Sequence, residues 1–136
     1  MHGLKTYLES AQKEHWAVPH FNVSDLDQLR GVCEAAAKLH APLMIGTSEG
    51  ERAFIGLKQA VALVHTFREE FGIPIFLNAD HTKSVKAAKA AIDAGYDSIH
   101  IDLSREPYVK NLTATREVMR YAKRKNKNIN VEGELG

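Results

Sequence analysis

The sequence has little cysteine, no long apolar run and no excess charge of one sign. Cys33 is the one cysteine among 136 residues, so no disulfide can form within the chain, and a reducing cytoplasm is the expected location. No stretch approaches the roughly 18 apolar residues of a membrane-spanning helix, and the first residues lack the apolar core of a signal peptide. A net charge of +1 gives no general attraction to nucleic acid or to an anionic membrane.

Glycine motifs for nucleotides are also absent. No Gly-x-Gly-x-x-Gly or P-loop pattern occurs, and the segment 46–50, which has two glycines, lacks the lysine that a P-loop requires. What the chain does have is an ordinary globular composition, with 44% hydrophobic and 26% charged residues. Its length suits one domain, and we expect residues 1–136 to form one.

Short apolar runs alternate with segments of helical periodicity. Ser24 and Ser84 offer N-cap oxygens, whereas Gly72 and Gly95 follow helical faces as C-terminal glycines do. The apolar spacing of 3–4 residues between these signals predicts helices, and the shorter runs predict strands. The expected helices cover residues 4–14, 24–39, 55–71, 84–95 and 107–122, and the expected strands cover residues 17–23, 43–46, 74–79, 98–103 and 128–134.

This succession predicts an α/β fold with a parallel sheet that helices cover. Repeated right-handed crossovers permit either an open doubly wound sheet or a closed barrel, and the pattern alone does not choose between them. Polar residues end nearly every expected strand, which favours a barrel whose loops meet at one mouth. A full eight-stranded barrel takes about 250 residues. We therefore expect part of a TIM barrel, with about four βα units and a fifth strand.

The strongest chemical signal lies at the end of the third expected strand, where Asp80 and His81 follow an apolar run. A neutral imidazole suits zinc and similar divalent ions, so His81 is the first candidate metal ligand. The alternative is a loop histidine in ordinary hydrogen bonds. Asp80 would lie close to such a metal and could exchange a proton with a substrate hydroxyl. Its alternatives are a helix cap or a support for a ligand.

Other strand ends supply further polar groups. Asp102 and Glu134 are hard oxygen donors for a divalent cation, although capping and salt bridges are open alternatives. Asn22 and Ser48 could position a polar substrate by hydrogen bonds, and turn formation is the alternative for both. His100 lies within a strand, where a buried histidine with satisfied hydrogen bonds is expected.

Four segments, in this order and at this spacing, resemble the N-terminal half of the class II, metal-dependent fructose-1,6-bisphosphate aldolases. The resemblance covers nearly the whole chain. The segments are residues 18–23 (VPHFNV), 78–81 (Asn-Ala-Asp-His), 95–104 (GYDSIHIDLS) and 131–136 (VEGELG).

The resemblance implies a (β/α)8 barrel and a glycolytic lyase. The implied reaction is reversible aldol cleavage of a ketose 1,6-bisphosphate to dihydroxyacetone phosphate and an aldehyde, with Zn2+ as the Lewis acid. By the same resemblance, His81 is the first of three zinc-binding histidines, and Asp80 is the acid/base acting on the C4 hydroxyl. Asp102 and Glu134 match an alternative or second metal position, and Asn22 and Ser48 match substrate-contact positions.

The chain departs from the family pattern at its end. The other two zinc histidines and the glycine-rich phosphate sites belong to later strands, so we expect a half that is not active alone. Its partner would be a complementary C-terminal half or a second copy, because a half-barrel with an apolar inner face exposes open sheet edges. Two alternatives stay open: a non-catalytic, self-assembling half-barrel, and a tagatose-bisphosphate aldolase type of lyase.

Overall fold

The strands of the sheet run parallel and lie side by side in chain order. The computed structural model describes residues 3–136. Its strands are β1 (His20–Asn22), β2 (Leu43–Thr47), β3 (Ile75–Thr82), β4 (Ser98–Ile101) and β5 (Asn130–Gly133). A doubly wound sheet reverses its strand order at a switch point. The unbroken order β1-β2-β3-β4-β5 instead follows the succession of a barrel.

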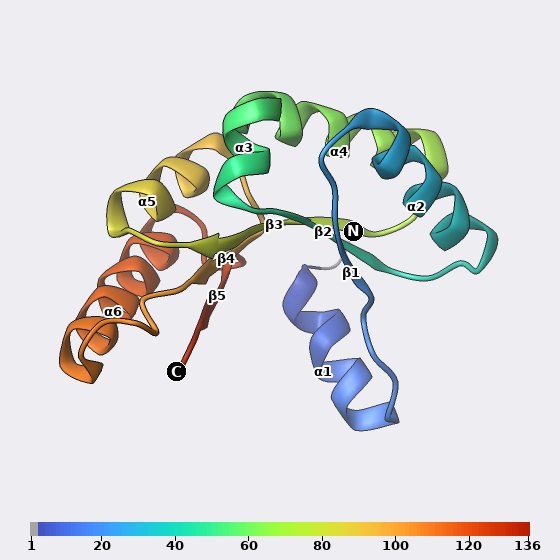
Figure 1. Ribbon diagram of the computed structural model, residues 1–136. Coiled ribbons are helices and arrows are strands. Elements are labelled where there is room, and N and C mark those ends of the chain that lie inside the picture. The colour runs from blue at the N-terminus through green and yellow to red at the C-terminus, as the bar shows by residue number, and fades with distance from the viewer. Residues whose placement is uncertain (1–2) are drawn as a thin grey trace.

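Helices flank the curved sheet mainly on its outer side. The helices are α1 (Leu4–Glu14), α2 (Leu26–Lys38), α3 (Glu49–Ile55), α4 (Leu57–Phe71), α5 (Val85–Ala94) and α6 (Tyr108–Lys125). Figure 1 shows α2 to α6 along the convex side and α1 on the concave side. The ring of Tyr7 in α1 lies 5.5 Å from the ring of Phe76 in β3, which fixes α1 against the concave face.

Most of the helix ends predicted from capping residues and glycines occur at the expected positions. Ser84 accepts a hydrogen bond from the Ala87 amide at the start of α5, and Gly72 and Gly95 end α4 and α5 in the left-handed conformation. One expected cap is wrong, because Asp25 and not Ser24 accepts the capping hydrogen bond at the start of α2.

The expected helix over residues 55–71 is also wrong at its start. The chain forms α3 from Glu49 to Ile55 and then bends at Gly56, whose φ of 92° is open to glycine at little cost, before α4 begins at Leu57. No helix was expected between the strand over residues 43–46 and the helix over residues 55–71. The prediction therefore missed a short helix that carries residues close to the strand ends.

The two faces of the sheet differ in the side chains they present. Strand side chains alternate between faces, and those directed at the helices are aliphatic and at most 1% exposed: Leu43, Ile45, Ile75, Leu77, Ile99 and Ile101. Their neighbours on the concave face include Phe76, but also Asn78, Ser98 and His100. The apolar inner face expected from the sequence is therefore wrong, since this face is largely polar.

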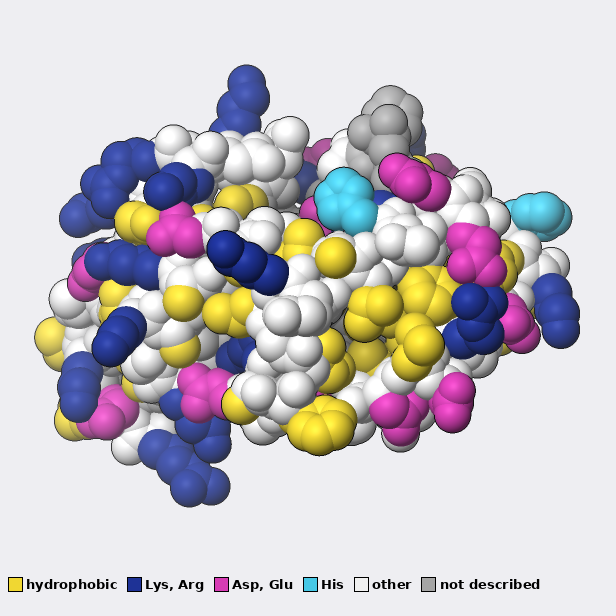
Figure 2. Space-filling model, turned by 90° about the horizontal axis from the view of Figure 1, so that it is seen from above, with side chains coloured by type: hydrophobic (Ala, Val, Ile, Leu, Met, Phe, Trp, Pro, Cys, Tyr) yellow, Lys and Arg dark blue, Asp and Glu magenta, His cyan; other side chains and the backbone are white. Residues whose placement is uncertain are grey.

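The outer surface is charged and mixed. Figure 2 looks onto the helices, and Lys and Arg side chains gather in it over the α5–α6 end of the molecule. Carboxylates neutralise part of this charge: Lys125 Nζ lies 2.7 Å from Asp93 Oδ1, and Lys89 Nζ lies 2.6 Å from Glu117 Oε1. Within residues 3–136, no helix is long and apolar enough to cross a membrane.

Candidate active site

A β-bulge turns two consecutive side chains of β3 toward the same edge of the sheet. Ala79 pairs with Ile99 and Thr82 pairs with Ile101. Between these two pairs β3 advances by three residues and β4 by two, so β3 carries one extra residue. His81 takes up the extra length with a φ of 42°, in the left-handed region. In a regular strand, Asp80 and His81 would point to opposite faces. The bulge lets both act at one site.

Buried Arg52 of α3 holds the bulge in place by hydrogen bonds to residues of β3. Its guanidinium donates to the Asp80 carbonyl and to the Thr82 hydroxyl, at 3.0 Å each, and also to the Thr47 carbonyl. Burial lowers the pKa of Arg52, but nearby anionic groups oppose this. Arg52 is 6% exposed and was missed from the sequence, because its helix was missed.

Asp80 is held as a carboxylate by donors from two other strands. Asn22 Nδ2 in β1 donates to Asp80 Oδ2 at 3.0 Å, and His100 Nδ1 in β4 lies 3.1 Å from Asp80 Oδ1. Burial acts to raise the pKa of Asp80, but hydrogen bonds from Asn22 and His100 outweigh it and lower the pKa. Neither of these contacts is a helix cap, so that alternative for Asp80 does not describe this structure.

His81 lies between two carboxylates from later strands. Its Nδ1 is 2.9 Å from Asp102 Oδ2 and 3.4 Å from Glu134 Oε2. Asp102 Oδ1 also accepts from the amide and hydroxyl of Ser104, at 3.1 and 2.7 Å. The hydrogen bonds from Ser104 and His81 lower the pKa of Asp102, and the hydrogen bond to Asp102 raises the pKa of His81.

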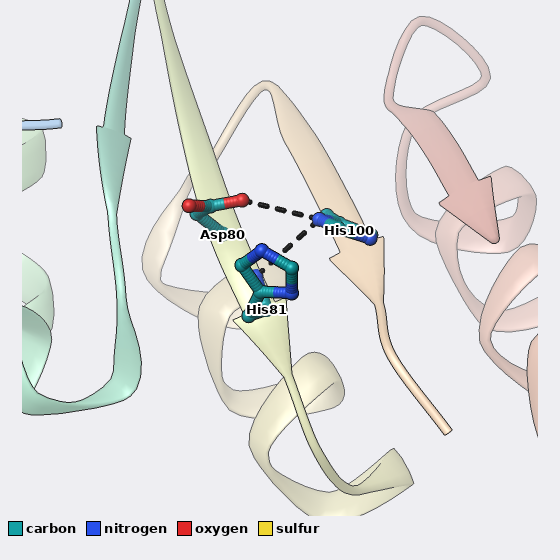
Figure 3. A group of neighbouring side chains, drawn as sticks. All are labelled: Asp80, His81 and His100. Carbon is teal, nitrogen blue, oxygen red and sulfur yellow. Dashed lines mark hydrogen bonds and ion pairs between the residues drawn. The ribbon is translucent and has the colours of Figure 1, made fainter. Parts of the chain in front are cut away.

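His100 joins the site, although we expected it only as a buried strand residue with satisfied hydrogen bonds. It is 7% exposed, and its ring centroid lies 4.5 Å from that of His81. Figure 3 shows His100 reaching from β4 toward Asp80 and the backbone of His81. Its alternation with Ser98 and Asp102 along the chain was the signal that could have found it, because all three fall on one strand face.

The two expected substrate-contact residues lie in different settings. Asn22 contacts Asp80 directly and also donates to Glu51 Oε2 at 3.2 Å. Ser48 is the N-cap of α3, where its Oγ accepts from the Glu51 amide and Glu51 Oε2 accepts from the Ser48 amide. The structure thus places Asn22 beside the acid/base candidate. Ser48 takes part in a capping box, the turn-forming role that the sequence left open.

Among residues 3–136, two overlapping groups of side chains can hold a metal ion. Asp80, His81 and His100 form one, and His81, Asp102 and Glu134 form the other, each with its ligand atoms within 4.8 Å of one another. Imidazole and carboxylate donors fit Zn2+ and similar divalent ions. An open hollow of ≈ 620 Å³ adjoins the second group, and its lining also includes Lys83 and Arg105.

Comparison with known proteins agrees with this geometry. The profile of the family "Fructose-bisphosphate aldolase class-II" matches residues 2–136. A fructose-bisphosphate aldolase of Geobacillus stearothermophilus is 35% identical over 98% of this chain, and a 6-phospho-5-dehydro-2-deoxy-D-gluconate aldolase of Bacillus licheniformis is also 35% identical over 98%. The chain covers 47% and 46% of these two proteins, so it spans about half the length of these relatives.

Solved structures give the same fold. The YdjI aldolase from Escherichia coli K12 superposes with a TM-score of 0.89 at 24% identity, over 99% of this chain and 52% of that one. A putative fructose-1,6-biphosphate aldolase from Coccidioides immitis superposes with a TM-score of 0.81 at 26% identity, over 94% of this chain and 44% of that one. The parallel half-sheet, its strand-end site and these matches together show that the chain belongs to the class II fructose-bisphosphate aldolase family.

Proposed function

We propose that this chain supplies the acid/base group and part of the metal centre of a class II aldolase that cleaves a phosphorylated ketose reversibly. One observation carries the proposal: β3, β4 and the segment after β5 bring Asp80, His81, Asp102 and Glu134 together at one edge of the sheet. His81 Nδ1 lies within 3.4 Å of a carboxylate oxygen from each of the last two. Capping alone does not require such convergence.

Asp80 has the setting of a general base. Its lowered pKa keeps it ionised at neutral pH, and Asn22 and His100 orient its two oxygens. In the cleavage direction, Asp80 accepts the proton of the C4 hydroxyl while the C3–C4 bond breaks, and in the reverse direction it returns that proton. A bound divalent metal supplies Lewis-acid polarisation of the substrate carbonyl.

The neighbouring groups fit a phosphorylated, polyhydroxy substrate. Lys83 and Arg105 line the hollow beside His81, where their charges can attract a phosphate. Asn22 and Ser48 are the candidates for hydroxyl contacts. The two relatives at 35% identity are named for different aldol substrates, a fructose bisphosphate and 6-phospho-5-dehydro-2-deoxy-D-gluconate. Together with tagatose bisphosphate, the alternative that the resemblance left open, they are the three substrates to compare in one assay.

A complementary C-terminal half is part of this proposal. Because this chain covers about half of its relatives, we propose that a complementary C-terminal half pairs with β1 and β5 and completes the barrel in the cytoplasm. The test is aldol cleavage with and without the C-terminal part of the Geobacillus stearothermophilus relative, co-expressed with this chain. We expect turnover only from the pair. A co-purified pair with bound metal and no cleavage of any of the three substrates would contradict the proposal.

The second candidate is a non-catalytic half-barrel that assembles with itself. The edge strands β1 and β5 each pair with a single neighbour, which leaves backbone donors and acceptors available to another copy. Light scattering of the chain alone across micromolar concentrations tests this. A stable dimer that a C-terminal half does not displace favours self-assembly, whereas a monomer of 15.1 kDa rules it out.

A further inference from the structure

Two imidazoles approach one carboxylate oxygen at the mouth of the half-barrel. Glu134 Oε2 lies 2.8 Å from His100 Nε2 and 3.4 Å from His81 Nδ1. This oxygen is buried, and it makes no aligned hydrogen bond with any residue between 3 and 136, despite the short separation from His100. Donor atoms bound to one metal at about 2.0–2.2 Å are themselves roughly 3.0–3.5 Å apart. The 3.4 Å separation from His81 lies within this range and the 2.8 Å separation from His100 lies just below it, so both imidazoles approach Glu134 at close to the spacing of ligands that share a metal.

The other nitrogen of His100 is already engaged. Nδ1 lies 3.1 Å from Asp80 Oδ1 and 3.5 Å from the His81 amide nitrogen, and dashed lines mark both contacts in Figure 3. The shorter contact fits the tautomer of His100 whose Nδ1–H donates to the carboxylate of Asp80. That tautomer leaves the Nε2 lone pair free, on the side of Glu134. A carboxylate that fixes a histidine in this way is the usual support of a metal-binding imidazole.

We propose that His100 is a metal ligand, and that His81, His100 and Glu134 hold a divalent transition metal within this one chain. Two imidazoles and one carboxylate are a ligand set that zinc and ferrous ions accept. The proposal rests on the proposed function only for the roles of His81 and Glu134. The family resemblance takes the further zinc histidines from later strands, whereas here the second imidazole comes from β4 of the same chain.

The proposal has a direct competitor, in which His100 only orients Asp80. A positioning role needs Nδ1 alone, whereas a ligand role needs Nε2. His100→Asn distinguishes the positioning role from the ligand role. The amide nitrogen of asparagine can still donate to Asp80, but asparagine has no atom that corresponds to Nε2 on the side of Glu134. His65 lies exposed on α4, away from these residues, so His65→Asn is the matched control.

The experiment is a Zn2+ competition titration of the 136-residue chain against a chromophoric chelator, followed by Co2+ absorption spectra. We expect one metal ion per chain, at least about tenfold weaker binding for His100→Asn and for His81→Ala, and no change for His65→Asn. The Co2+ spectrum should shift in His100→Asn, since one nitrogen ligand is lost. Unchanged affinity and spectrum in His100→Asn would overturn the proposal and leave the role of His81 intact.

A measurement on the unmodified chain covers the case in which His100→Asn fails to fold. With 113Cd2+ bound to 15N-histidine protein, the Nε2 signal of His100 should split by coupling to cadmium. An unsplit His100 signal beside a split His81 signal contradicts the ligand role. Absence of any metal binding to the chain alone also overturns the proposal that His100 is a ligand. The proposed function is tested separately, by the cleavage assay on the paired halves.

Discussion

On the helix-covered face of the sheet, Ile75, Leu77 and Ile99 are at most 1% exposed and meet other apolar side chains. One residue along, on the concave face, Asn78 and Ser98 are nearly as buried. The two faces thus share the same strands and similar burial but differ in polarity. Burial of apolar area stabilises the covered face by about 25 cal/mol per Å².

The concave face lacks this stabilisation. Asn78 Oδ1 and Asn130 Nδ2 are buried, and within residues 3–136 they find no hydrogen-bond partner. A buried polar atom without a partner costs about 1–3 kcal/mol. The comparison indicates that the covered face supplies most of the stability of the fold. The concave face contributes less, because it carries buried polar groups, which could find hydrogen-bond partners in a completed barrel. Four changes test this division, from the largest expected effect to the smallest.

Asp80→Asn should cause the largest change, and only in activity. In the paired halves we expect turnover to fall about 10²–10⁴-fold, because an amide cannot accept the hydroxyl proton. This corresponds to about 3–5.5 kcal/mol in the barrier. The amide oxygen can still accept from His100, so metal content and urea midpoint should stay near those of the unmodified protein. A normal turnover number would remove Asp80 from the mechanism.

Ile99→Ala should damage the fold. Ile99 is 0% exposed on the covered face, and truncation there is expected to lower the free energy of unfolding by about 2–5 kcal/mol, measured by urea denaturation. Its neighbour Ser98 lies on the other face and provides the control. Ser98→Ala should cost about 1 kcal/mol or less. Equal losses for the two variants would show that the faces do not differ in their contribution to stability.

Gly46→Ala should disturb the concave face with little harm to the fold. A Cβ at position 46 would collide with the side-chain ends of His20 and Asn22, so Asn22 must leave Asp80. Loss of a hydrogen bond to a charged group is worth about 1.5–3 kcal/mol, so turnover of the paired halves should fall at least about tenfold. Gly31→Ala, with no atom within 4 Å of the added Cβ, is the control and should leave turnover unchanged.

The smallest expected effect concerns pH and the metal-free chain. The hydrogen bond to Asp102 raises the pKa of His81 above its ordinary 6.5. The pair therefore stabilises the fold fully below pH 6.5, and this stabilisation disappears as pH rises through the higher, folded-state pKa. Because the His81 side chain is 49% exposed, we expect less than about 1 kcal/mol.

Urea denaturation at pH 5.5 and pH 9 checks this prediction. His81→Gln should be less stable than the unmodified chain at pH 5.5, and the difference should vanish at pH 9. His65→Gln is the control for an exposed histidine and should show no such dependence. A larger difference at pH 9 than at pH 5.5 would have the wrong sign for a raised pKa.

The sequence predicted the parts of the fold that local chemistry decides. The bounds of α1 agree with the expected 4–14, and the cap at Ser84 and the glycine ends of α4 and α5 follow from residues within one helical turn of each end. The barrel-like strand order also followed from the polar strand ends. The split at Gly56 was missed, because an isolated glycine beside apolar residues does not show which conformation it adopts.

Residues that meet across the sheet were harder to predict. Asp80 and His81 stood out because they end an apolar run, whereas alternation with Asp102 indicates only which strand face His100 occupies, not that it contacts Asp80. That contact depends on the register between β3 and β4 and on the bulge at the end of β3. Arg52 likewise contacts the carbonyl of Asp80 from a helix 28 residues earlier in the chain.

The bulge in β3 also makes the chain sensitive to insertions and deletions at this point. Between Ala79 and Thr82 the strand carries one residue more than its partner β4. Loss of Asp80 or His81 would restore the regular pleat and leave only the other of the two on the concave face, so the site would lose one of its two groups from β3. Substitutions at these positions would test chemistry, but a change in chain length would misdirect the site without altering the residue types around it.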